Sequence, residues 1–244
     1  MTAPVLSASS LTREFGDDTA VAELDLVVAS GEIHAIVGLN GAGKTTLMRL
    51  LLGMLRPTLG SAKLLGQEAM AAPPHLFAKV GYLIETPFAY NELTVRENLR
   101  SAALLHGVNS ADLTRLVDSV VDGFELNRWV DRRAGVLSLG NRQRLGLASS
   151  FVHEPSVLVL DEPANALDPA GVVFIRELLR ERAEAGAAIL VSSHHLDQVA
   201  RIADRITVLH RGRRIGRLDP TGFDLETLFF EQVYEADRRQ GRAA

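Results

Sequence analysis

The sequence predicts an α/β fold with a mainly parallel sheet, an antiparallel β subdomain at the N-terminus and an inserted α-helical subdomain. Short apolar runs bounded by turn residues alternate along the chain with segments whose apolar residues recur at helical spacing. Because strands that alternate with helices favour right-handed crossovers, this order predicts a parallel sheet covered by helices on both faces. With 244 residues, the chain can bury the core of one large domain.

Apolar runs between turn signals predict the strands of this sheet. These strands are expected at 32–38, 80–84, 156–160, 187–193 and 204–210, with a further short strand at 213–218 after a turn. Amphipathic spacing predicts a helix in most of the intervening segments. These helices are expected at 44–53, 95–107, 111–121, 141–152, 169–183 and 196–203.

Three parts of the chain depart from the alternation of strands and helices. Residues 86 to about 150 hold three helical segments and no convincing strand, so we interpret them as an inserted helical subdomain. The first thirty residues instead have the pattern of two antiparallel strands, 5–15 and 19–29, joined by a Gly-Asp-Asp turn. Residues 224–239 predict a C-terminal helix whose apolar face either packs on the core or binds a partner.

Composition excludes several classes of protein. The absence of cysteine excludes a disulfide framework, a thiolate nucleophile and a cysteine-based metal centre, and it suits a reducing cytoplasm. The net charge of −4 argues against nucleic acid as the main ligand, because proteins that bind phosphate backbones normally carry a basic surface. The chain also lacks a long apolar run and a basic segment followed by an apolar one near its start. We therefore expect neither a membrane span nor an export signal.

The segment GLNGAGKTT, residues 38–46, has the composition of a phosphate-binding loop and is called the phosphate loop below. It follows a predicted strand and opens a predicted helix, which is the context that gives such a match its meaning. Gly38, Gly41 and Gly43 permit backbone conformations that turn successive N–H groups toward an anion. We expect Lys44 to reach the β- and γ-phosphates of a nucleotide and Thr45 to offer a hydroxyl to Mg²⁺.

Two strand ends carry candidate catalytic groups. The run SVLVLDEP ends in Asp161 and Glu162, which point to opposite sides because successive strand residues alternate. We expect Asp161 to bind Mg²⁺ and Glu162 to orient and polarise the water that attacks the γ-phosphate; the alternative is a pair of solvated acids. His194, with His195 beside it, ends the run AAILVSSHH, and it is either a surface imidazole or a hydrogen-bonding partner of the γ-phosphate or the attacking water.

The segment LSLGNRQRLGLA, residues 137–148, predicts a helix N-terminus. Ser138 has the character of an N-cap, and apolar residues recur at helical spacing beyond Gly140. The free N–H groups and partial positive charge of a helix start suit a phosphate. The sequence therefore predicts a second anion site, about a hundred residues after the phosphate loop.

Five segments in register resemble the ATP-binding cassette (ABC) transporter ATPases over residues 5–230. In chain order these are GLNGAGKTT as Walker A, LSLGNRQRLGLA as signature, VLVLDEP as Walker B, ANALDP as D-loop and VSSHHL as the switch-histidine segment. The resemblance implies one cassette domain over 1–230, with the helical subdomain at about 86–150 inserted and residues 224–244 as C-terminal helix and tail. ATP and Mg²⁺ are its implied cofactors.

The resemblance also assigns roles to particular residues. It implies that Phe15 stacks on adenine, although Phe15 could instead be a core aromatic. The implied nucleotide-binding residues are Phe15, Gly38, Asn40, Gly41, Ala42, Gly43, Lys44, Thr45 and Thr46. In ABC ATPases two cassettes meet head to tail, so the signature residues would bind the nucleotide of the partner, with Asp168 of the D-loop linking the two sites. The signature residues are Ser138, Leu139, Gly140 and Asn141.

Two departures from the family pattern bear on mechanism and placement. The signature begins LSLGN where the common form is LSGGQ, so Leu139 replaces the first glycine. Glu85 stands at the Q-loop position, usually glutamine, where it could bind Mg²⁺ but adds negative charge near phosphates. The segment GYLIETPFAY followed by LTVRENL resembles the bacitracin-resistance and lantibiotic-immunity branch, which implies export of a drug, peptide or lipid-like substrate.

The resemblance implies two partners: a second copy or related cassette, and a separate integral membrane permease. The chain would then lie on the inner face of the cell membrane. We expect Pro87–Leu99, with Phe88 and Tyr90, to dock the permease, unless these residues pack as an ordinary loop. The alternative is a soluble ABC ATPase that acts on ribosomes or nucleic acid through the basic segments 128–133 and 211–217. A P-loop kinase would leave the signature and D-loop unexplained.

Overall fold

The computed structural model describes residues 4–241 and divides the chain into two compact units. One unit consists of Met1–Ala72 with Ala183–Ala244, and the other consists of Pro73–Arg182. Each unit contains both strands and helices, in agreement with the predicted α/β class. Among residues 4–241, none of the helices is both long and apolar enough to span a membrane.

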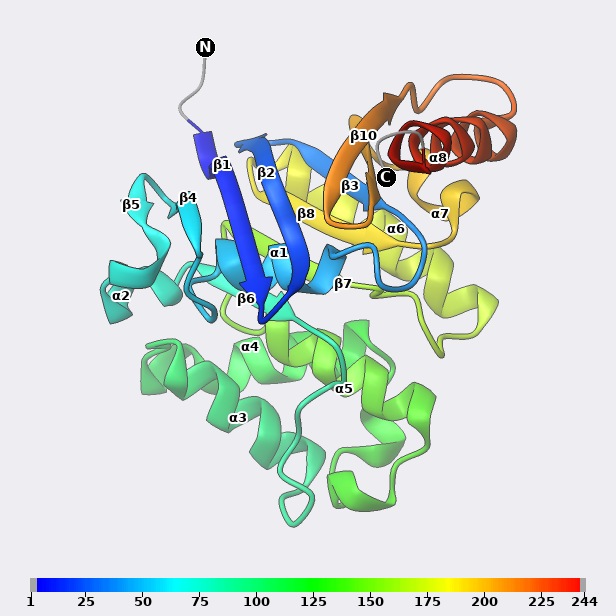
Figure 1. Ribbon diagram of the computed structural model, residues 1–244. Helices are drawn as coiled ribbons and strands as arrows, with labels where there is room; N and C mark the ends of the chain where they lie inside the picture. Colours follow the sequence, from blue (N-terminus) through cyan, green and yellow to red (C-terminus); the bar gives the residue numbers. More distant parts are fainter. Residues whose placement is uncertain (1–3, 242–244) are drawn as a thin grey trace. The chain divides into compact units, whose positions relative to one another are not determined.

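The first unit contains the antiparallel sheet that the N-terminal pattern predicts (Figure 1). Strand β1 (Pro4–Phe15) pairs antiparallel with β2 (Asp18–Ala29) on one side and with β4 (Leu59–Leu64) on the other. The two-residue strand β5 (Gln67–Glu68) extends the sheet beyond β4. The sequence did not predict β4 and β5, because only Ala62 and Leu64 of these strands are buried and their apolar pattern is too short to register.

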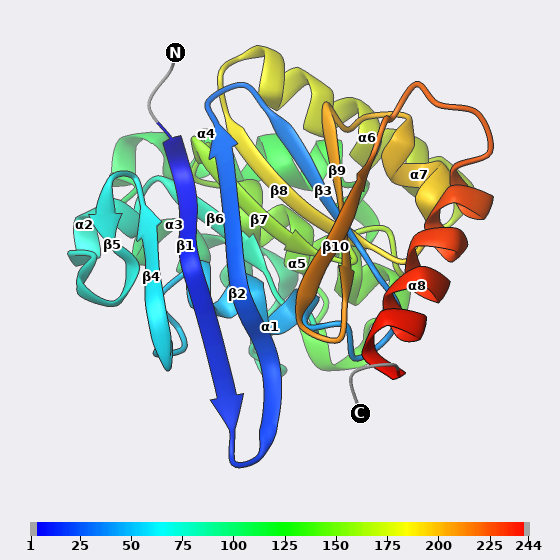
Figure 2. The same cartoon turned by 45° about the horizontal axis from the view of Figure 1, so that its top comes forward.

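Parallel strands form the second sheet of this unit (Figure 2). The central strand β3 (Ile33–Val37) pairs in parallel with β8 (Ala188–Ser193) and with β9 (Arg205–His210), and β10 (Arg213–Leu218) returns antiparallel to β9. Every residue of β3 and β8 is buried, as is typical of parallel strands. Because Val37 pairs with Ser193, the segments that follow β3 and β8 leave from the same edge of the sheet.

Among residues 4–72 and 183–241, the first unit has three α-helices of its own. Helix α1 (Lys44–Leu51) follows the phosphate loop, α7 (Leu196–Ala200) follows β8, and α8 (Leu225–Gly241) lies against β9 and β10. A 3₁₀ turn, η1 (Ala69–Ala71), follows β5. Helix α7 ends three residues before the predicted boundary at 203, and a hydrogen-bonded turn continues it, in which Val199 O accepts from Ile202 N at 3.0 Å and from Ala203 N at 2.8 Å.

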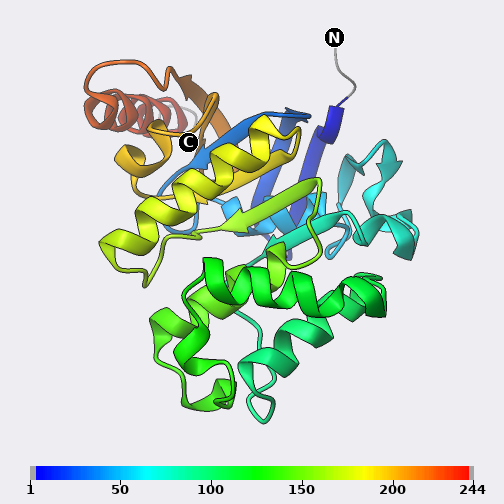
Figure 3. The ribbon, with the colours of Figure 1, turned by 180° about the vertical axis from the view of Figure 1, so that it is seen from behind.

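The second unit contains two parallel strands and the three helices that the sequence predicts between residues 95 and 152 (Figure 3). Strand β6 (Val80–Leu83) pairs in parallel with β7 (Val157–Asp161). Helices α3 (Val95–Leu105), α4 (Ser110–Gly123) and α5 (Leu139–Phe151) contact one another, and the short α2 (Pro74–Phe77) precedes β6. Two 3₁₀ turns, η2 (Asn127–Trp129) and η3 (Ala134–Val136), lead into α5. Helix α6 (Pro169–Glu184) follows β7 and reaches the boundary between the units.

A stacked histidine pair, of which His153 is buried and His106 is half-buried, lies within the second unit. His153 is 8% exposed, and its ring stacks on that of His106 with centroids 3.8 Å apart. Its Nε2 hydrogen-bonds with Val80 O at 3.1 Å. Burial, together with the neighbouring charge of His106, lowers the pKa of His153 to about 4. The folded protein therefore keeps this imidazole neutral at mildly acidic pH.

Acid should destabilise the fold through His153. Below a pH of about 6.5 the unfolded chain takes up a proton at this residue, whereas the folded chain does so only near pH 4, so stability falls as pH falls through this window. We expect this group to lower the free energy of unfolding by about 2 kcal/mol between about pH 7 and about pH 5. Urea unfolding of the wild type and of His153→Phe at both pH values measures the effect.

The variant His153→Phe keeps an aromatic ring beside His106 but cannot titrate, so its loss of stability on acidification should be smaller by that amount. The matched control is His75→Phe, which removes an exposed histidine of α2 and should leave the wild-type pH dependence unchanged. Identical pH dependence in the wild type and His153→Phe would contradict the assignment.

Candidate functional site

The residues singled out in the sequence fall into both units. The first unit contains the phosphate loop, Phe15 and His194, and the second contains Glu85, Asp161, Glu162, the signature residues 138–141 and Asp168. The phosphate loop runs from the end of β3 to the start of α1, as the sequence predicts. Gly43 is the N-cap of α1 and has a φ of +99°.

Two glycines of the phosphate loop are required by close backbone approaches. A β-carbon on Gly38 would overlap with Leu209 O of β9, and a β-carbon on Gly43 would overlap with Ala20 O of β2. Gly41 also has a positive φ of +79°, in open space. Because any side chain at Gly38 or Gly43 would displace a strand, the loop holds its backbone in the one conformation that these neighbours permit.

Lys44 places an ammonium group inside this loop. Its side chain is buried at 7% exposure, and Nζ donates to Gly38 O at 2.8 Å and to Leu39 O at 3.4 Å. Thr45 and Thr46 follow in the first turn of α1, at the end where a helix carries partial positive charge. A buried cation beside such a helix start forms an electropositive cradle for phosphate.

His194 reaches the same region of the first unit. It leaves β8 from the edge at which the phosphate loop leaves β3. His194 and His195 stack with ring centroids 3.9 Å apart, and Ser193 Oγ accepts a hydrogen bond from His195 N at 2.9 Å. His194, Gly38 and Leu39 line one pocket of about 290 Å³. The structure thus brings His194 and the phosphate loop together.

Phe15 lies at the exposed end of β1 and is not a core side chain. The ring is 48% exposed, and the Arg13 guanidinium carbon stands 4.4 Å from its centroid. Arg13 is itself held by a hydrogen bond from Nη1 to Arg56 O at 3.0 Å. An exposed ring with a cation over one face is suited to stacking on a planar base. Sequence reasoning did not identify Arg13, although its position two residues before Phe15 in the strand places both side chains on one side.

The acidic pair of the second unit ends the buried strand β7. Asp161 is 5% exposed, and the half-buried Glu162 has a φ of +50°. Gln143 of α5 anchors the next residue, because its Nε2 donates to Pro163 O at 3.0 Å. Positive φ also occurs at Glu85, which is exposed after β6, and at Ala166 in the D-loop. Strained non-glycine residues cluster at functional sites, and these three lie in segments that the sequence singled out.

The signature residues begin α5. Ser138 is the N-cap, and its Oγ accepts a hydrogen bond from Asn141 N at 3.3 Å, so the predicted cap is confirmed and the helix begins at Leu139. A β-carbon on Gly140 would lie 2.8 Å from Ala166 O of the D-loop. Leu139 is 68% exposed. The fold therefore requires glycine at 140, whereas the position at which leucine replaces the family's glycine has room for a side chain.

A polar pocket opens beside the signature residues. It has a volume of about 570 Å³, and its lining includes Ser138, Asn141, Trp129 and Asp168. Arg144 also lines this pocket and forms two ion pairs there. Its Nη1 contacts Glu125 Oε2 at 2.6 Å, and its Nη2 contacts Asp168 Oδ1 at 2.7 Å. Sequence reasoning missed Arg144, although its place one turn beyond Gly140 put it on the same face of α5.

Asp168 is fixed from two sides. Its Oδ1 accepts a hydrogen bond from Gly171 N at 3.1 Å as well as from Arg144. The backbone hydrogen bond from Gly171, followed by the hydrogen bond and charge of Arg144, holds the pKa of Asp168 below its usual value. Arg144 therefore links the D-loop carboxylate to the helix that carries the signature.

Replacing Arg144 should impair hydrolysis more than nucleotide binding. Arg144→Lys keeps the charge but loses the planar fork that reaches Glu125 and Asp168 together. We expect kcat for ATP hydrolysis to fall about tenfold while the Kd for ATP stays unchanged. Steady-state kinetics and equilibrium binding test this. Arg115→Lys, at an exposed ion pair with Asp112, is the control, and an unchanged kcat in Arg144→Lys would refute the link.

Comparison with known proteins agrees with this arrangement. A family model described as "ABC transporter" matches residues 21–165, more than half of the chain. The bacitracin transport ATP-binding protein BcrA of Enterococcus faecalis is 39% identical over 213 residues, which cover 86% of this chain and 68% of that protein. The lantibiotic transport ATP-binding protein SrtF of Streptococcus pyogenes is 33% identical over 236 residues, which cover 96% of this chain and all of that protein.

A solved structure supports the same conclusion. The structure of an ATP-binding subunit of an ABC transporter superposes with a TM-score of 0.87 at 29% identity, and it covers 94% of this chain and 99% of that one. The segments that carry the resemblance in the sequence also occupy the strand ends and helix starts described above. The chain therefore belongs to the ABC transporter family, as an ATP-binding subunit with ATPase activity.

Proposed function

We propose that this protein hydrolyses Mg²⁺-bound ATP to drive the export of a peptide antibiotic or a related drug or lipid-like molecule through a separate membrane permease. The bacitracin and lantibiotic transport proteins named above support this choice of substrate class, because they align with most of the chain. Nothing of this similarity favours the alternative of a soluble ATPase that acts on ribosomes or nucleic acid. The single observation that carries the ATPase assignment is the phosphate loop, in which the sterically required Gly38 and Gly43 are followed directly by the buried Lys44.

The residues of this loop fit a nucleotide triphosphate. Backbone N–H groups and the Lys44 ammonium supply positive charge for the phosphates, and the exposed ring of Phe15 supplies a stacking surface for adenine. Asn40, Gly41, Ala42, Thr45 and Thr46 complete the proposed binding segment. Arg13 would hold the Phe15 ring from one face while the base stacks on the other.

Mg²⁺ would be held by hard oxygen donors, namely the Thr45 hydroxyl and the Asp161 carboxylate, and Glu85 is a further candidate. The bound ion would neutralise charge on the phosphates. Glu162 is the proposed group that orients the attacking water and accepts its proton, a role that suits a half-buried carboxylate held by a strained backbone. His194 is the proposed hydrogen-bonding partner of the γ-phosphate, in keeping with its place on the pocket that Gly38 also lines.

Glu162→Gln should abolish turnover and spare binding. The amide keeps the size of the side chain but cannot accept the proton of the attacking water, so we expect kcat to fall at least about a hundredfold with the Kd for ATP unchanged. Phosphate release and nucleotide binding measure the two quantities. Glu181→Gln, at an exposed carboxylate of α6, should behave as wild type. Hydrolysis at the wild-type rate in Glu162→Gln would reject the role.

Two copies, or one copy and a related cassette, are proposed to act together. In this arrangement Ser138, Leu139, Gly140 and Asn141 would present the start of α5 to the γ-phosphate of the partner's nucleotide. The open polar pocket beside these residues is consistent with an incoming polar ligand. Asp168, fixed by Arg144 and Gly171, would set the D-loop between the two nucleotides.

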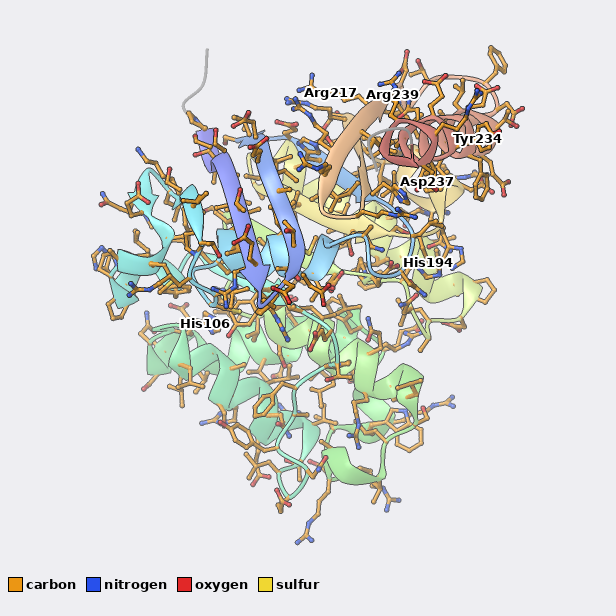
Figure 4. All side chains as sticks on the ribbon, in the orientation of Figure 1. His106, His194, Arg217, Tyr234, Asp237 and Arg239 are labelled. Carbon is orange, nitrogen blue, oxygen red and sulfur yellow. The ribbon has the colours of Figure 1, made fainter. Side chains whose placement is uncertain are left out.

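The proposed permease-docking surface lies on the second unit. Phe88 and Tyr90 are 73% and 45% exposed, and their rings meet edge to face with centroids 5.0 Å apart. Both line a pocket of about 220 Å³ together with Tyr82 and His106, of which Figure 4 labels His106. The buried Asn98 holds the loop from below, because its Oδ1 accepts from Tyr90 N at 2.8 Å and its Nδ2 donates to Tyr90 O at 3.1 Å. A fixed aromatic pair of this kind suits an apolar helix end.

Removing this aromatic pair should release the protein from membranes. Phe88→Ser with Tyr90→Ser eliminates the apolar contact area, and we expect at least about a tenfold lower membrane-bound fraction in cells that produce the permease. ATP binding should stay intact because the change lies outside the proposed nucleotide residues. Phe223→Ser, at a 96% exposed residue elsewhere, is the control. Unchanged membrane association in the double variant would refute this surface.

A further inference from the structure

The C-terminal helix α8 is fastened to the β9–β10 hairpin along its length. Phe229 and Val233 are buried, and Gln232 Nε2 donates to Arg217 O at 3.1 Å. The Gln232 side chain occupies the space that a β-carbon on Gly216 would need. These contacts lie within the first unit, where Figure 2 shows α8 beside β10.

Asp237 makes the charged part of this contact (Figure 4). Its Oδ1 accepts a hydrogen bond from His210 Nε2 at 3.0 Å and lies 3.0 Å from Arg211 Nη2. His210 is buried, whereas Arg211 is exposed. The hydrogen bond from His210, together with the charges of Arg211 and His210, holds the pKa of Asp237 below its usual value. The carboxylate therefore stays ionised against these two residues.

Arg211 sits in a backbone conformation that needs support. Its φ is +45° and that of Gly212 is +75°, so these two residues form the tight turn of the β9–β10 hairpin, in which arginine is a disfavoured first residue. Such a conformation persists only when the surroundings hold it in place. The ion pair with Asp237 is one contact that does so, and it comes from another element.

The residues on either side of His210 and Arg211 are the ones that touch the phosphate loop. Leu209 O packs against Gly38, and Gly212 N–H donates to Ala42 O at 2.9 Å. Gly212 also lies beside Gly43, with its Cα 3.4 Å from the position that a β-carbon would take. Residues 209–212 thus divide into two pairs. The outer pair, Leu209 and Gly212, contacts the phosphate loop, and the inner pair, His210 and Arg211, binds Asp237.

We propose that Asp237 is a positioning residue for nucleotide binding, which acts through His210 and Arg211 to hold the β9–β10 turn against the phosphate loop. The C-terminal helix is then a structural support of the nucleotide site and not only a cover for the core. Loss of the carboxylate removes one restraint on this turn, so the turn becomes more mobile at Gly212 and holds Ala42 of the phosphate loop less firmly. This inference rests on the proposed role of the phosphate loop in binding ATP.

The test is ATP binding by the full chain with the carboxylate removed. Asp237→Ala should raise the Kd for ATP about fivefold, the lower end of the range for coupling between sites, with a smaller change in kcat at saturating ATP. Hydrogen exchange at the Gly212 amide should become faster in the same variant, while exchange in β3 stays slow. Glu235→Ala is the matched control, because this carboxylate of α8 pairs with Arg239 of the same helix.

A second variant separates positioning from mere packing of α8. Arg211→Asn places a residue that tolerates positive φ at the strained position, so the effect of Asp237→Ala on Kd should shrink when the two changes are combined. If α8 acted only by packing, the effect of Asp237→Ala would be the same in both backgrounds, which would overturn the proposal. Asp237→Asn, which keeps an acceptor for His210, should bind ATP with intermediate affinity and replaces Asp237→Ala if the latter fails to fold.

The outcomes also distinguish this inference from the proposed function. Lys44→Ala should abolish ATP binding, and if it does not, the proposed nucleotide site itself is wrong. If Lys44→Ala abolishes binding while Asp237→Ala leaves both the Kd and the exchange of Gly212 unchanged, only the inference about the C-terminal helix is overturned.

Discussion

Close backbone approach around the phosphate loop is the constraint on which the first unit depends. Gly38 meets Leu209 O, and Gly43 meets Ala20 O, so the loop lies between a strand of the parallel sheet and a strand of the antiparallel sheet. A side chain at Gly38 would have to move β9, which is almost entirely buried, and one at Gly43 would have to move β2, whose residues are alternately buried and exposed from Ala22 to Val28. The two sheets therefore impose the shape of the loop, and the loop sequence supplies only the freedom to adopt it and the ammonium of Lys44.

In the second unit, hydrogen bonds from polar side chains of the helices fix the conformation of the loops. Asn98 of α3 hydrogen-bonds with Tyr90, Leu93 and Thr94, which fixes the segment after β6. Gln143 of α5 holds Pro163 after β7. Because buried amides with satisfied hydrogen bonds have few alternative partners, each specifies one position of its loop. The loops after β6 and β7 thus each have a rigid support within their own unit.

Features encoded by neighbouring residues could be predicted from the sequence, and features that depend on distant residues could not. The phosphate loop, the buried strands β3 and β8, and the N-cap Ser138 are local patterns, and each lies within a residue or two of its expected place. Strands β4 and β5 were missed because too few of their residues are buried. The bridge from Arg144 to Asp168 and the pairing of His210 with Asp237 join residues that are 24 and 27 positions apart, and no spacing rule predicts such pairs.

The residues that match the family's usual signature have structural roles in this fold, whereas the residues that depart from the usual signature and Q-loop lie at exposed positions. Ser138 and Gly140, which match the common pattern, have duties within the fold: one caps α5, and the other admits Ala166 O. Leu139 and Glu85, which differ from it, are exposed. The fold therefore constrains Ser138 and Gly140 independently of any ligand. Leu139 and Glu85 are instead accessible to a ligand or partner from the solvent side. A substitution at an exposed position can therefore change how the protein responds to a nucleotide or a partner without lowering the stability of the fold.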